Sequence, residues 1–260
     1  MDTIAVIGTG NVASHLMKAL SPHAATIQVN SRTLCGMPPH ADLAIIAVSD
    51  KAVAEVAENI ACRHPQFHGI ISHTAGSVGI DAIPGSFSRR GVIYPMQTFS
   101  AQTCLDYSKI PFFIEASDEN TARQLISLAE KVSSTVKKAD SALRKRIHIA
   151  SVLCCNFTNC LYTLADELLH RDGLDISLMI PLIEETVAKL ERIPPLLGQT
   201  GPARRGDTAV IHDHISALQD YPDIAAVYSL LSDTIIRNYK KTISNEQNRL
   251  RPFPHSRSGF

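Results

Sequence analysis

The sequence predicts an α/β fold in which a mostly parallel sheet is followed by an all-α C-terminal domain. Short apolar runs alternate with helical patterns over the first half of the chain, and residues 43–48 are continuously apolar, as in a strand buried on both faces. Such alternation is typical of a parallel sheet with right-handed crossovers. From residue 141 onward the chain shows helical patterns and no convincing strand.

The expected elements follow in order along the chain. The predicted strands are residues 3–7, 25–29, 43–48, 69–72, 91–94 and 111–114. The predicted helices are residues 12–20, 51–61, 118–132, 141–170, 175–193, 207–220 and 222–241. Asp118 is a suitable N-cap, and Gly173 is a suitable helix stop. The composition changes near residue 140, which predicts domains at 1–140 and 141–244 and a disordered tail at 245–260.

Composition excludes several classes of protein. The 260 residues carry 25 Lys and Arg against 25 Asp and Glu, whereas a nucleic-acid or polybasic membrane-surface protein needs a clustered positive excess. No uninterrupted apolar run approaches the roughly 18 residues of a membrane span, and we identify no signal peptide. We therefore expect a cytoplasmic protein with neither nucleic-acid nor membrane partners.

The cysteine and histidine spacings do not indicate a metal. The six cysteines include no CxxC pair, so we expect reduced, buried thiols. His212 and His214 are two positions apart, and on a helix such side chains point to different sides. We therefore predict no metal site.

A glycine-rich turn follows the first predicted strand. Residues 8–13 fit the pattern GxGxx(G/A), and they open a predicted helix. The first glycine permits a tight turn, the second lets the backbone approach a pyrophosphate, and Ala13 permits close helix–strand packing. Free N–H groups at the helix start favour the anion. The pattern predicts a Rossmann-type dinucleotide site, with contacts from Gly8, Thr9, Gly10, Asn11 and Val12.

The end of the second strand predicts which cofactor binds. NAD-binding proteins carry an acidic residue about 20 positions after the glycines, for the ribose 2′-hydroxyl. Here Asn30, Ser31 and Arg32 stand at that point, and no Asp or Glu occurs between Thr3 and Ala41. Arg32 can pair with a 2′-phosphate that Asn30 and Ser31 can hydrogen-bond, so we predict NADP. The alternative for Arg32 is a solvated surface charge.

The Rossmann-type sheet is predicted to be trimmed between its second and fourth strands. Residues 33–41 join the second strand directly to 43–48, which leaves no room for the usual helix and third strand. Further cofactor contacts are expected where later strands end, because ligands bind there in doubly wound sheets. These are Val48, Ser49, His73 and Thr74. For His73 the alternative is a histidine that stabilises the turn.

Several motifs together resemble one known family. Besides the glycine turn and residues 30–33, they are residues 72–77, 91–100, 155–157 and 199–202. Over nearly the whole chain, from about residue 3 to 240, they resemble bacterial proteins described as NADP oxidoreductases, with a Rossmann-like N-terminal domain and an uncharacterised helical C-terminal domain. That family is similar to pyrroline-carboxylate reductases, ketopantoate reductases and 6-phosphogluconate dehydrogenase-like proteins. The resemblance implies a helical domain that often dimerises and a substrate cleft between the domains.

Polar residues of the long predicted helix are the candidates for chemistry. His148 and Asn156 fall on the side opposite its broad apolar face. The related hydroxyacid dehydrogenases place a Lys four residues before an Asn on the equivalent helix, whereas Val152 precedes Asn156 here. We therefore predict His148 as proton donor and Asn156 as hydrogen-bonding orienter. The alternatives are a structural or surface His148 and an Asn156 amide bonded across the domain interface.

Two functions remain open, besides a degenerate fold that binds no nucleotide and has structural duties only. The first is an NADP-dependent oxidoreductase that transfers a hydride between NADP(H) and a small carbonyl or imine in the interdomain cleft. The second is a non-catalytic NADP(H)-binding sensor or regulatory protein. Arg204 and Arg205 lie in a loop where they could clamp a substrate anion, although solvated loop arginines are commoner. The helical domain is too elongated to bury its apolar residues alone, so we expect a homodimer.

Overall fold

The computed structural model describes residues 1–101 and 103–244, and side chains as far as residue 240. Contacts divide the chain into two compact units, the first ending at Thr158 and the second beginning at Asn159. The first unit thus extends past residue 140, because the start of the long helix contacts the sheet. The expected tail at 245–260 lies outside the described residues.

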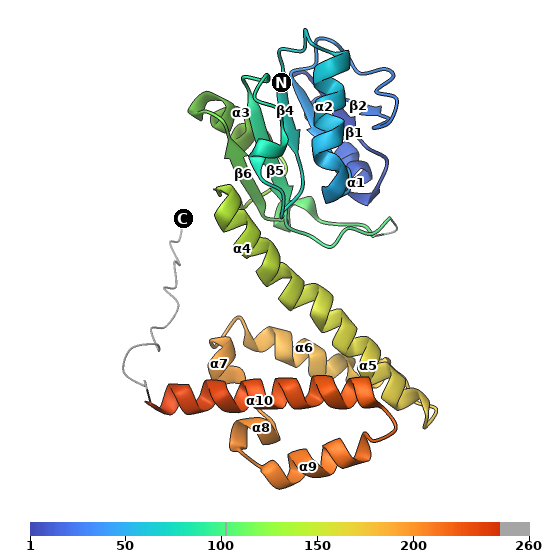
Figure 1. Ribbon diagram of the computed structural model, residues 1–260, viewed down its shortest axis with the longest axis vertical. Coiled ribbons are helices and arrows are strands. Elements are labelled where there is room, and N and C mark those ends of the chain that lie inside the picture. Colours follow the sequence, from blue (N-terminus) through green and yellow to red (C-terminus); the bar gives the residue numbers. More distant parts are fainter. Residues whose placement is uncertain (102, 245–260) are drawn as a thin grey trace. The chain divides into compact units, whose positions relative to one another are not determined.

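The first unit is built on a seven-stranded sheet with the order β2-β1-β3-β4-β5-β6-β7 (Figure 1). The strands are β1 (Thr3–Ile7), β2 (Ala25–Val29), β3 (Leu43–Ile46), β4 (Ile70–His73), β5 (Arg90–Pro95), β6 (Phe112–Ala116) and β7 (Val136–Lys138). All neighbouring pairs are parallel except β5 and β6, which are antiparallel. The predicted mostly parallel sheet is confirmed, whereas the short strand β7 was not predicted.

The trimmed Rossmann-type topology is also confirmed. Strand β1 lies between β2 and β3, and β2 is the edge of the sheet as far as the chain is described. The connection between β2 and β3 folds as turns, with hydrogen bonds from Leu34 N to Asn30 O (2.9 Å) and from Met37 N to Leu34 O (3.3 Å). Leu34 and Met37 are buried in the core and replace the packing of the missing elements.

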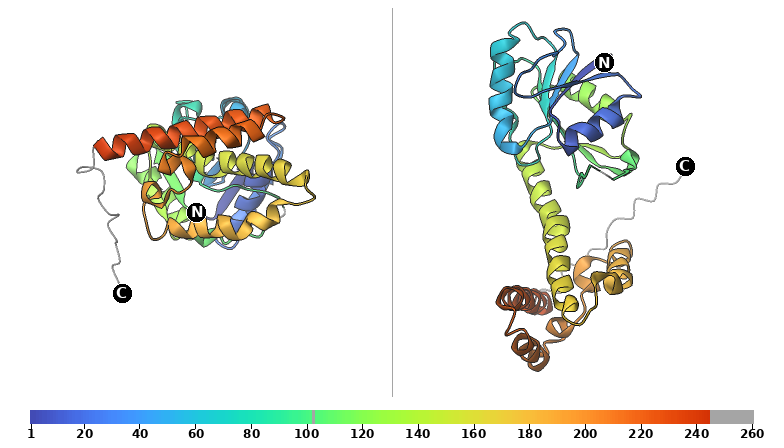
Figure 2. Two further views of the ribbon diagram at one scale, coloured as in Figure 1. Left: turned by 90° about the horizontal axis from the view of Figure 1, so that it is seen from below. Right: turned by 90° about the vertical axis from the view of Figure 1, so that its right-hand side faces the viewer.

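Helices cover both faces of this sheet. Helices α1 (Asn11–Leu20) and α3 (Glu119–Ala129) lie on one face, and α2 (Val53–Arg63) lies on the other (Figures 1 and 2). Each face has its own buried apolar cluster, as expected for a doubly wound sheet. Asp118 caps α3, as predicted, by accepting a 2.9 Å hydrogen bond from Thr121 N. Short 3₁₀ turns occur at Asp50–Ala52, Ile80–Ala82 and Tyr107–Lys109.

The long predicted helix is helical throughout, but it is not regular. Helix α4 (Ser141–Ser151) passes into a π-helical segment, η4 (Val152–Phe157), and then into α5 (Thr158–His170). The sequence predicted no such irregularity. The range Ser141–His170 also contains a window with a mean hydropathy of 1.3, which meets the length and composition of a membrane span, and none of this window is buried. Length and composition alone are weak evidence for a membrane span, since core helices of soluble proteins also meet both criteria.

The second unit is all helical in its described part. After α5 it contains a 3₁₀ turn, η5 (Ile176–Met179), and then α6 (Ile180–Lys189), α7 (Pro195–Gly198), α8 (Pro202–Arg205), α9 (Thr208–Ala217) and α10 (Pro222–Ser244). Helix α10 packs against α8 and α9 (Figure 1). The short helices α7 and α8 were not predicted. Many apolar side chains of this unit are exposed, including Leu182 at 65% and Leu230 at 62%.

Candidate functional site

Gly8 is required by the fold itself. Its φ angle is +139°, and a Cβ atom there would lie 2.2 Å from the carbonyl oxygen of Ala47. Its N–H donates to Val29 O at 2.9 Å, so the turn after β1 is held against the end of β2. Only glycine fits this conformation and this close approach, as the sequence pattern implies.

Gly10 is different, because the protein leaves open space around it. Its φ angle is −80°, and a Cβ atom there would have no heavy atom of another residue within 4 Å beyond its chain neighbours. The first N–H groups of any helix lack intrahelical acceptors, and Gly10, the N-cap of α1, supplies no side-chain acceptor for them. Thr9, Gly10 and Asn11 are exposed, and Val12 is half-buried. This arrangement suits a ligand phosphate, since helix N-termini favour anions.

The loop after β2 is ordered by two sets of hydrogen bonds. Oδ1 of Asn30 accepts from Arg32 N (2.9 Å) and Thr33 N (3.2 Å), which makes an Asx turn. Arg63, the last residue of α2, donates from Nη1 to Thr33 O (3.0 Å) and Arg32 O (3.4 Å). The exposed Arg32 guanidinium has no partner among the described residues, and Ser31 is half-exposed. Arg63 was not predicted, because it reaches this loop from a separate helix.

Val48 and Ser49 lie beside the glycine turn. A Cβ atom on Gly8 would lie 3.5 Å from Cγ1 of Val48, and Ser49 is exposed at the start of the following 3₁₀ turn. Asp50 accepts a hydrogen bond from the hydroxyl of Ser77. The loops that follow β3 and β4 therefore meet next to the start of α1.

His73 is fully buried and both of its ring nitrogens have backbone partners. Nδ1 accepts from Ala75 N at 3.2 Å, and Nε2 donates to Gly79 O at 3.2 Å. Burial lowers the pKa of His73 to about 4, and the hydrogen bond to Gly79 opposes this shift. This geometry favours the turn-stabilising alternative for His73. Thr74, also buried, donates its N–H to Ile46 O at 3.2 Å.

A pocket of about 690 Å³ lies within the first unit, between the end of β5 and the long helix. Both predicted catalytic residues, His148 and Asn156, line it. Its other lining residues are Tyr94, Met96, Gln97, Thr98, Phe99, Phe113, Ile147, Ala150, Ser151, Cys154 and Cys155. The structure therefore brings the two predicted residues to one pocket, together with a tyrosine that was not assigned a role from the sequence.

Tyr94 and His148 form a pair. The Tyr94 hydroxyl lies 3.2 Å from Nδ1 of His148, and the two rings meet edge-on with centroids 6.0 Å apart. Gly76 makes room for them, because a Cβ atom there would lie 2.8 Å from Cζ of Tyr94 and 2.9 Å from His148 Nδ1. Nε2 of His148 has no hydrogen-bond partner within the described chain. The pair thus orients the imidazole and leaves Nε2 for a ligand.

Tyr94 remains a neutral phenol near neutral pH. Burial raises the pKa of its hydroxyl, and a hydrogen bond with Ser151 opposes the shift in part. A phenol both donates and accepts a hydrogen bond. It can therefore hold Nδ1 whether His148 is neutral or protonated.

The π-helical segment η4 brings Asn156 toward the face of His148. In a regular α-helix, residues eight positions apart are rotated by about 80° from each other. A π-helix has more residues per turn, so each residue of η4 rotates less. This turns Asn156 back toward His148, and both line the same pocket. Single π-helical turns are frequent at functional sites.

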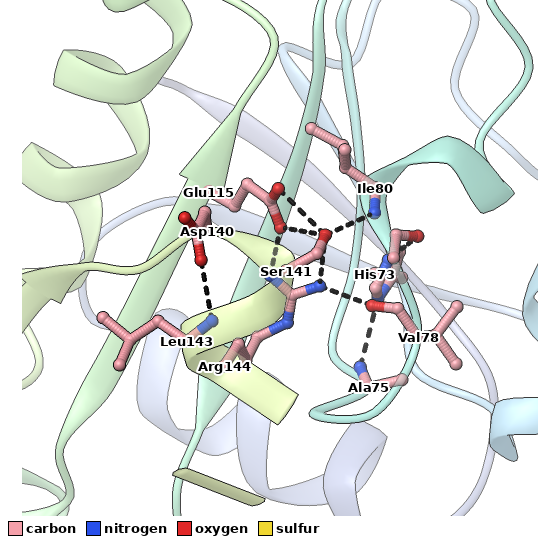
Figure 3. A network of polar contacts seen from close by, with 10 residues as sticks. His73, Ala75, Val78, Ile80, Glu115, Asp140, Ser141, Leu143 and Arg144 are labelled. Carbon is pink, nitrogen blue, oxygen red and sulfur yellow. Dashed lines mark hydrogen bonds and ion pairs between the residues drawn. The ribbon is translucent and has the colours of Figure 1, made fainter. Parts of the chain in front are cut away.

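A buried polar network fixes the start of α4 (Figure 3). Arg144 is 0% exposed and donates to the Glu115 carboxylate and to Val78 O. The Ser141 hydroxyl lies 2.9 Å from both Glu115 oxygens and accepts from Ile80 N at 3.3 Å. The network ties α4 to β6 and to the loop after β4, and His148 follows Arg144 by one helical turn. Arg144 therefore places His148 opposite Tyr94.

The loop after β5 links the pocket to the start of α1. Asn11 Nδ2 donates to Phe99 O at 3.1 Å, and Nε2 of the buried His15 donates to Ser100 O at 2.9 Å. Nδ1 of His15 then accepts from the Tyr107 hydroxyl at 3.0 Å. Phe99 also lines the pocket, so the loop after β5 contacts both the start of α1 and the pocket.

Arg204, His214 and the six cysteines were also considered from the sequence, and the structure shows the surroundings of each. The Arg204 guanidinium stacks 3.9 Å from the centroid of Tyr239, which favours a structural role over anion binding. His214 pairs through Nδ1 with the Tyr228 hydroxyl at 2.8 Å. The expectation of buried thiols is wrong, because all six cysteines are exposed. Cys154 and Cys155 lie on η4, and both line the pocket.

Comparisons with known proteins extend these findings. Residues 110–235 match a family described as a domain of unknown function (DUF2520). A solved structure from Bacteroides fragilis, named as a "putative NADP oxidoreductase", is 38% identical, with a TM-score of 0.82, over 91% of this chain and 98% of that one. The chain therefore belongs to the family of this Bacteroides protein. No match was found among functionally curated proteins.

More distant structures share the fold. An imine reductase from Streptomyces aurantiacus is 13% identical with a TM-score of 0.60, over 95% of this chain and all (100%) of that one. A pyrroline-5-carboxylate reductase from Coxiella burnetii is 15% identical with a TM-score of 0.51, over 92% and 97% of the two chains. The fold resemblance to pyrroline-carboxylate reductases that the motifs indicated is confirmed.

Proposed function

We propose that the protein is an NADP-dependent oxidoreductase that transfers a hydride between NADP(H) and the carbonyl or imine carbon of a small molecule. The observation that supports this best is the Tyr94–His148 pair in the 690 Å³ pocket, with the Nδ1–hydroxyl distance of 3.2 Å. A proton donor oriented in a pocket is what reduction of a carbonyl or imine requires. The Bacteroides fragilis relative, which is described as an NADP oxidoreductase, supports the same class of reaction.

The residues present fit NADP. The open space at Gly10 and the uncapped start of α1 suit a pyrophosphate. Arg32, with Asn30 and Ser31, suits a 2′-phosphate, and the loop carries no carboxylate to repel one. When bound, the reduced nicotinamide supplies the hydride. In this proposal Val48 and Ser49 contact the cofactor from beside the glycine turn and Thr74 contacts it from the end of β4, whereas His73 holds the turn after β4.

His148 supplies the proton in this proposal. As the substrate carbon gains the hydride, the double-bond electron pair moves to oxygen or nitrogen, which then takes a proton from Nε2 of His148. Nδ1–H of the imidazolium donates to the Tyr94 oxygen during this step, so the ring keeps its orientation. The Asn156 amide donates a hydrogen bond to the same substrate atom and stabilises its developing charge.

We also propose that the protein is a cytoplasmic homodimer. Its six free thiols suit a reducing compartment. In the second unit the apolar side chains of Val187 and Leu190 are 58% and 56% exposed, in addition to those of Leu182 and Leu230. Exposed apolar surface of this kind marks interfaces, and two-fold dimers are the commonest assemblies. A dimeric mass by light scattering is expected. That the substrate binds between the two domains stays a prediction.

The test is a titration followed by a turnover assay. The purified protein is titrated with NADPH and NADH by nucleotide fluorescence, and oxidation of NADPH is then followed with a panel of small ketones, aldehydes and imines. His148→Gln is expected to lower kcat by about 10²–10⁴-fold with the NADPH Kd unchanged. The exposed His23→Gln is the matched control. NADPH binding without turnover of any compound would instead favour a sensor.

A further inference from the structure

The pocket of Tyr94 and His148 has no permanently charged side chain in its wall. Among the described residues that line it there is no Lys, Arg, Asp or Glu. Much of its wall is apolar and comes from Met96, Phe99, Phe113, Ile147 and Ala150. Its polar groups are hydroxyls, amides, thiols and the imidazole. The one positive charge that the described wall can carry is the proton of His148, and in the proposed reaction the reduced oxygen or nitrogen takes that proton, so no permanent cation is left for an anionic substituent.

The cations of α4 are already used or do not line the pocket. Arg144 is fully buried, and its guanidinium donates to Glu115 and to Val78 O rather than into the pocket. Lys145 and Arg146 lie on α4 and do not line the pocket. No cation among these is aimed at a ligand in the pocket.

A carboxylate would bind poorly in such a place. Moving an anion out of water has a large desolvation free energy unless a cation compensates it. Neutral hydrogen-bond donors offset only part of that free energy. Proteins that recognise carboxylates or phosphates generally present Arg or Lys to them. A neutral carbonyl or imine needs only one or two donors, which His148 and Asn156 provide.

We propose that this site selects an uncharged carbonyl or imine compound with a compact apolar body, and that it discriminates against carboxylate-bearing analogues. The inference rests on the proposed oxidoreductase function and specifies its substrate class. The volume of about 690 Å³ lies in the range of about 300–1,000 Å³ that is common for small-molecule sites. The apolar wall binds the body of the compound, while the reacting double bond faces the donors.

Two pairs of compounds matched in shape test the proposal. Each pair has one neutral and one anionic member: 1-pyrroline with 1-pyrroline-5-carboxylate, and 4-methylcyclohexanone with 4-oxocyclohexanecarboxylate. Binding to the full-length protein is measured by calorimetry, with and without saturating NADP⁺, and turnover is measured by NADPH oxidation. In each pair we expect the neutral member to bind at least about tenfold more tightly, which corresponds to about 1.4 kcal/mol. The same preference is expected in kcat/KM.

A variant adds the missing charge. Thr98 is exposed and lines the pocket, so Thr98→Lys places an ammonium group there at little cost to packing. It is expected to reduce the preference for the neutral member by at least about tenfold. Thr98→Met has a side chain of similar bulk without charge, and it separates the effect of charge from that of size.

The results distinguish this inference from the proposed function. A carboxylate that binds as tightly as its neutral partner overturns the inference, and so does a failure of both neutral compounds to bind. Failure of the proposed function is seen separately, as no NADPH oxidation with any compound, even if the binding preference is present.

Discussion

The guanidinium of Arg144 pairs with the carboxylate of Glu115 although the Arg144 side chain is fully buried. The pair joins the first turn of α4 to β6, and Ser141 joins the same carboxylate to the loop after β4. A fully buried arginine has a large desolvation cost. The buried pair holds in place the helix that carries His148. The desolvation cost of burying Arg144 is therefore accompanied by a fixed position for His148 in the pocket.

Removal of Arg144 is therefore expected to destabilise the protein strongly. Arg144→Met removes the cation beside Glu115, which keeps only Ser141, and the donor to Val78 O, and loss of one member of a buried pair costs about 3–5 kcal/mol. Arg146→Met, two positions along the same helix but exposed, is expected to change stability by less than about 0.5 kcal/mol. Urea denaturation measures both. Equal, small losses in the two variants would show that the network is dispensable.

The two glycines of the turn after β1 are expected to separate folding from binding. Gly8→Ala puts a Cβ atom 2.2 Å from Ala47 O at a φ angle of +139°, so it is expected to lower the melting temperature markedly. Gly10→Ala meets open space at a φ angle of −80°, so stability is expected to change by less than about 1 kcal/mol. Its methyl group instead faces the proposed pyrophosphate and is expected to raise the NADPH Kd about tenfold or more. Unchanged nucleotide binding by Gly10→Ala would contradict this site.

The sheet was predictable because its strands carry strong local signals. Strands β1 and β2 have the bounds that their β-branched and apolar residues indicate, and Asp118 caps α3 as expected. Strand β7 was missed because three residues ending in two lysines show no usable periodicity. The π-helical η4 was missed because its residues also suit an α-helix. No particular residue type marks the extra residue per turn of a π-helix.

The site was predictable only where one segment carries it. The glycine turn and the end of β2 are continuous in sequence, so their chemistry could be inferred directly. Tyr94 lies near the end of β5 and Gly76 follows β4. They are far from His148 in the sequence, so their contact with it is visible only in the folded structure. Arg63 likewise reaches residues 32 and 33 from α2. His73 could have either role from its position, and only its two backbone hydrogen bonds favour the structural one.

His73 is expected to make the protein less stable as the pH falls. Its pKa is about 4 in the folded protein and about 6.5 in the unfolded chain, because burial disfavours the charged ring. The unfolded state therefore binds a proton more readily, and stability decreases as the pH falls through 6.5 and levels off below about 4. The loss approaches about 3 kcal/mol. His73→Gln is expected to flatten this pH dependence in chemical denaturation, whereas His23→Gln is not. An imidazole of His73 that titrates near 6.5 by NMR would contradict the prediction.

Arg63 is expected to contribute to the choice between NADPH and NADH. Its Nη1 donates to the carbonyl oxygens of Arg32 and Thr33, so it holds the loop that presents Arg32 and adds a second positive charge beside it. Arg63→Ala is expected to raise the NADPH Kd about tenfold and to leave the NADH Kd within about twofold, since only NADPH carries the 2′-phosphate.

Arg63→Lys keeps the charge without the planar fork that spans two carbonyl groups, so its Kd for NADPH is expected to lie between those of the wild type and Arg63→Ala. Arg123→Ala, an exposed arginine on α3 at the opposite face of the sheet, is the control and leaves the ratio of the two Kd values unchanged. Fluorescence titration with both nucleotides measures each ratio. If Arg32→Ala lowers NADPH selectivity and Arg63→Ala does not, the loop holds its shape without Arg63 and Arg32 alone recognises the phosphate. If neither variant changes the ratio, the phosphate does not bind at this loop.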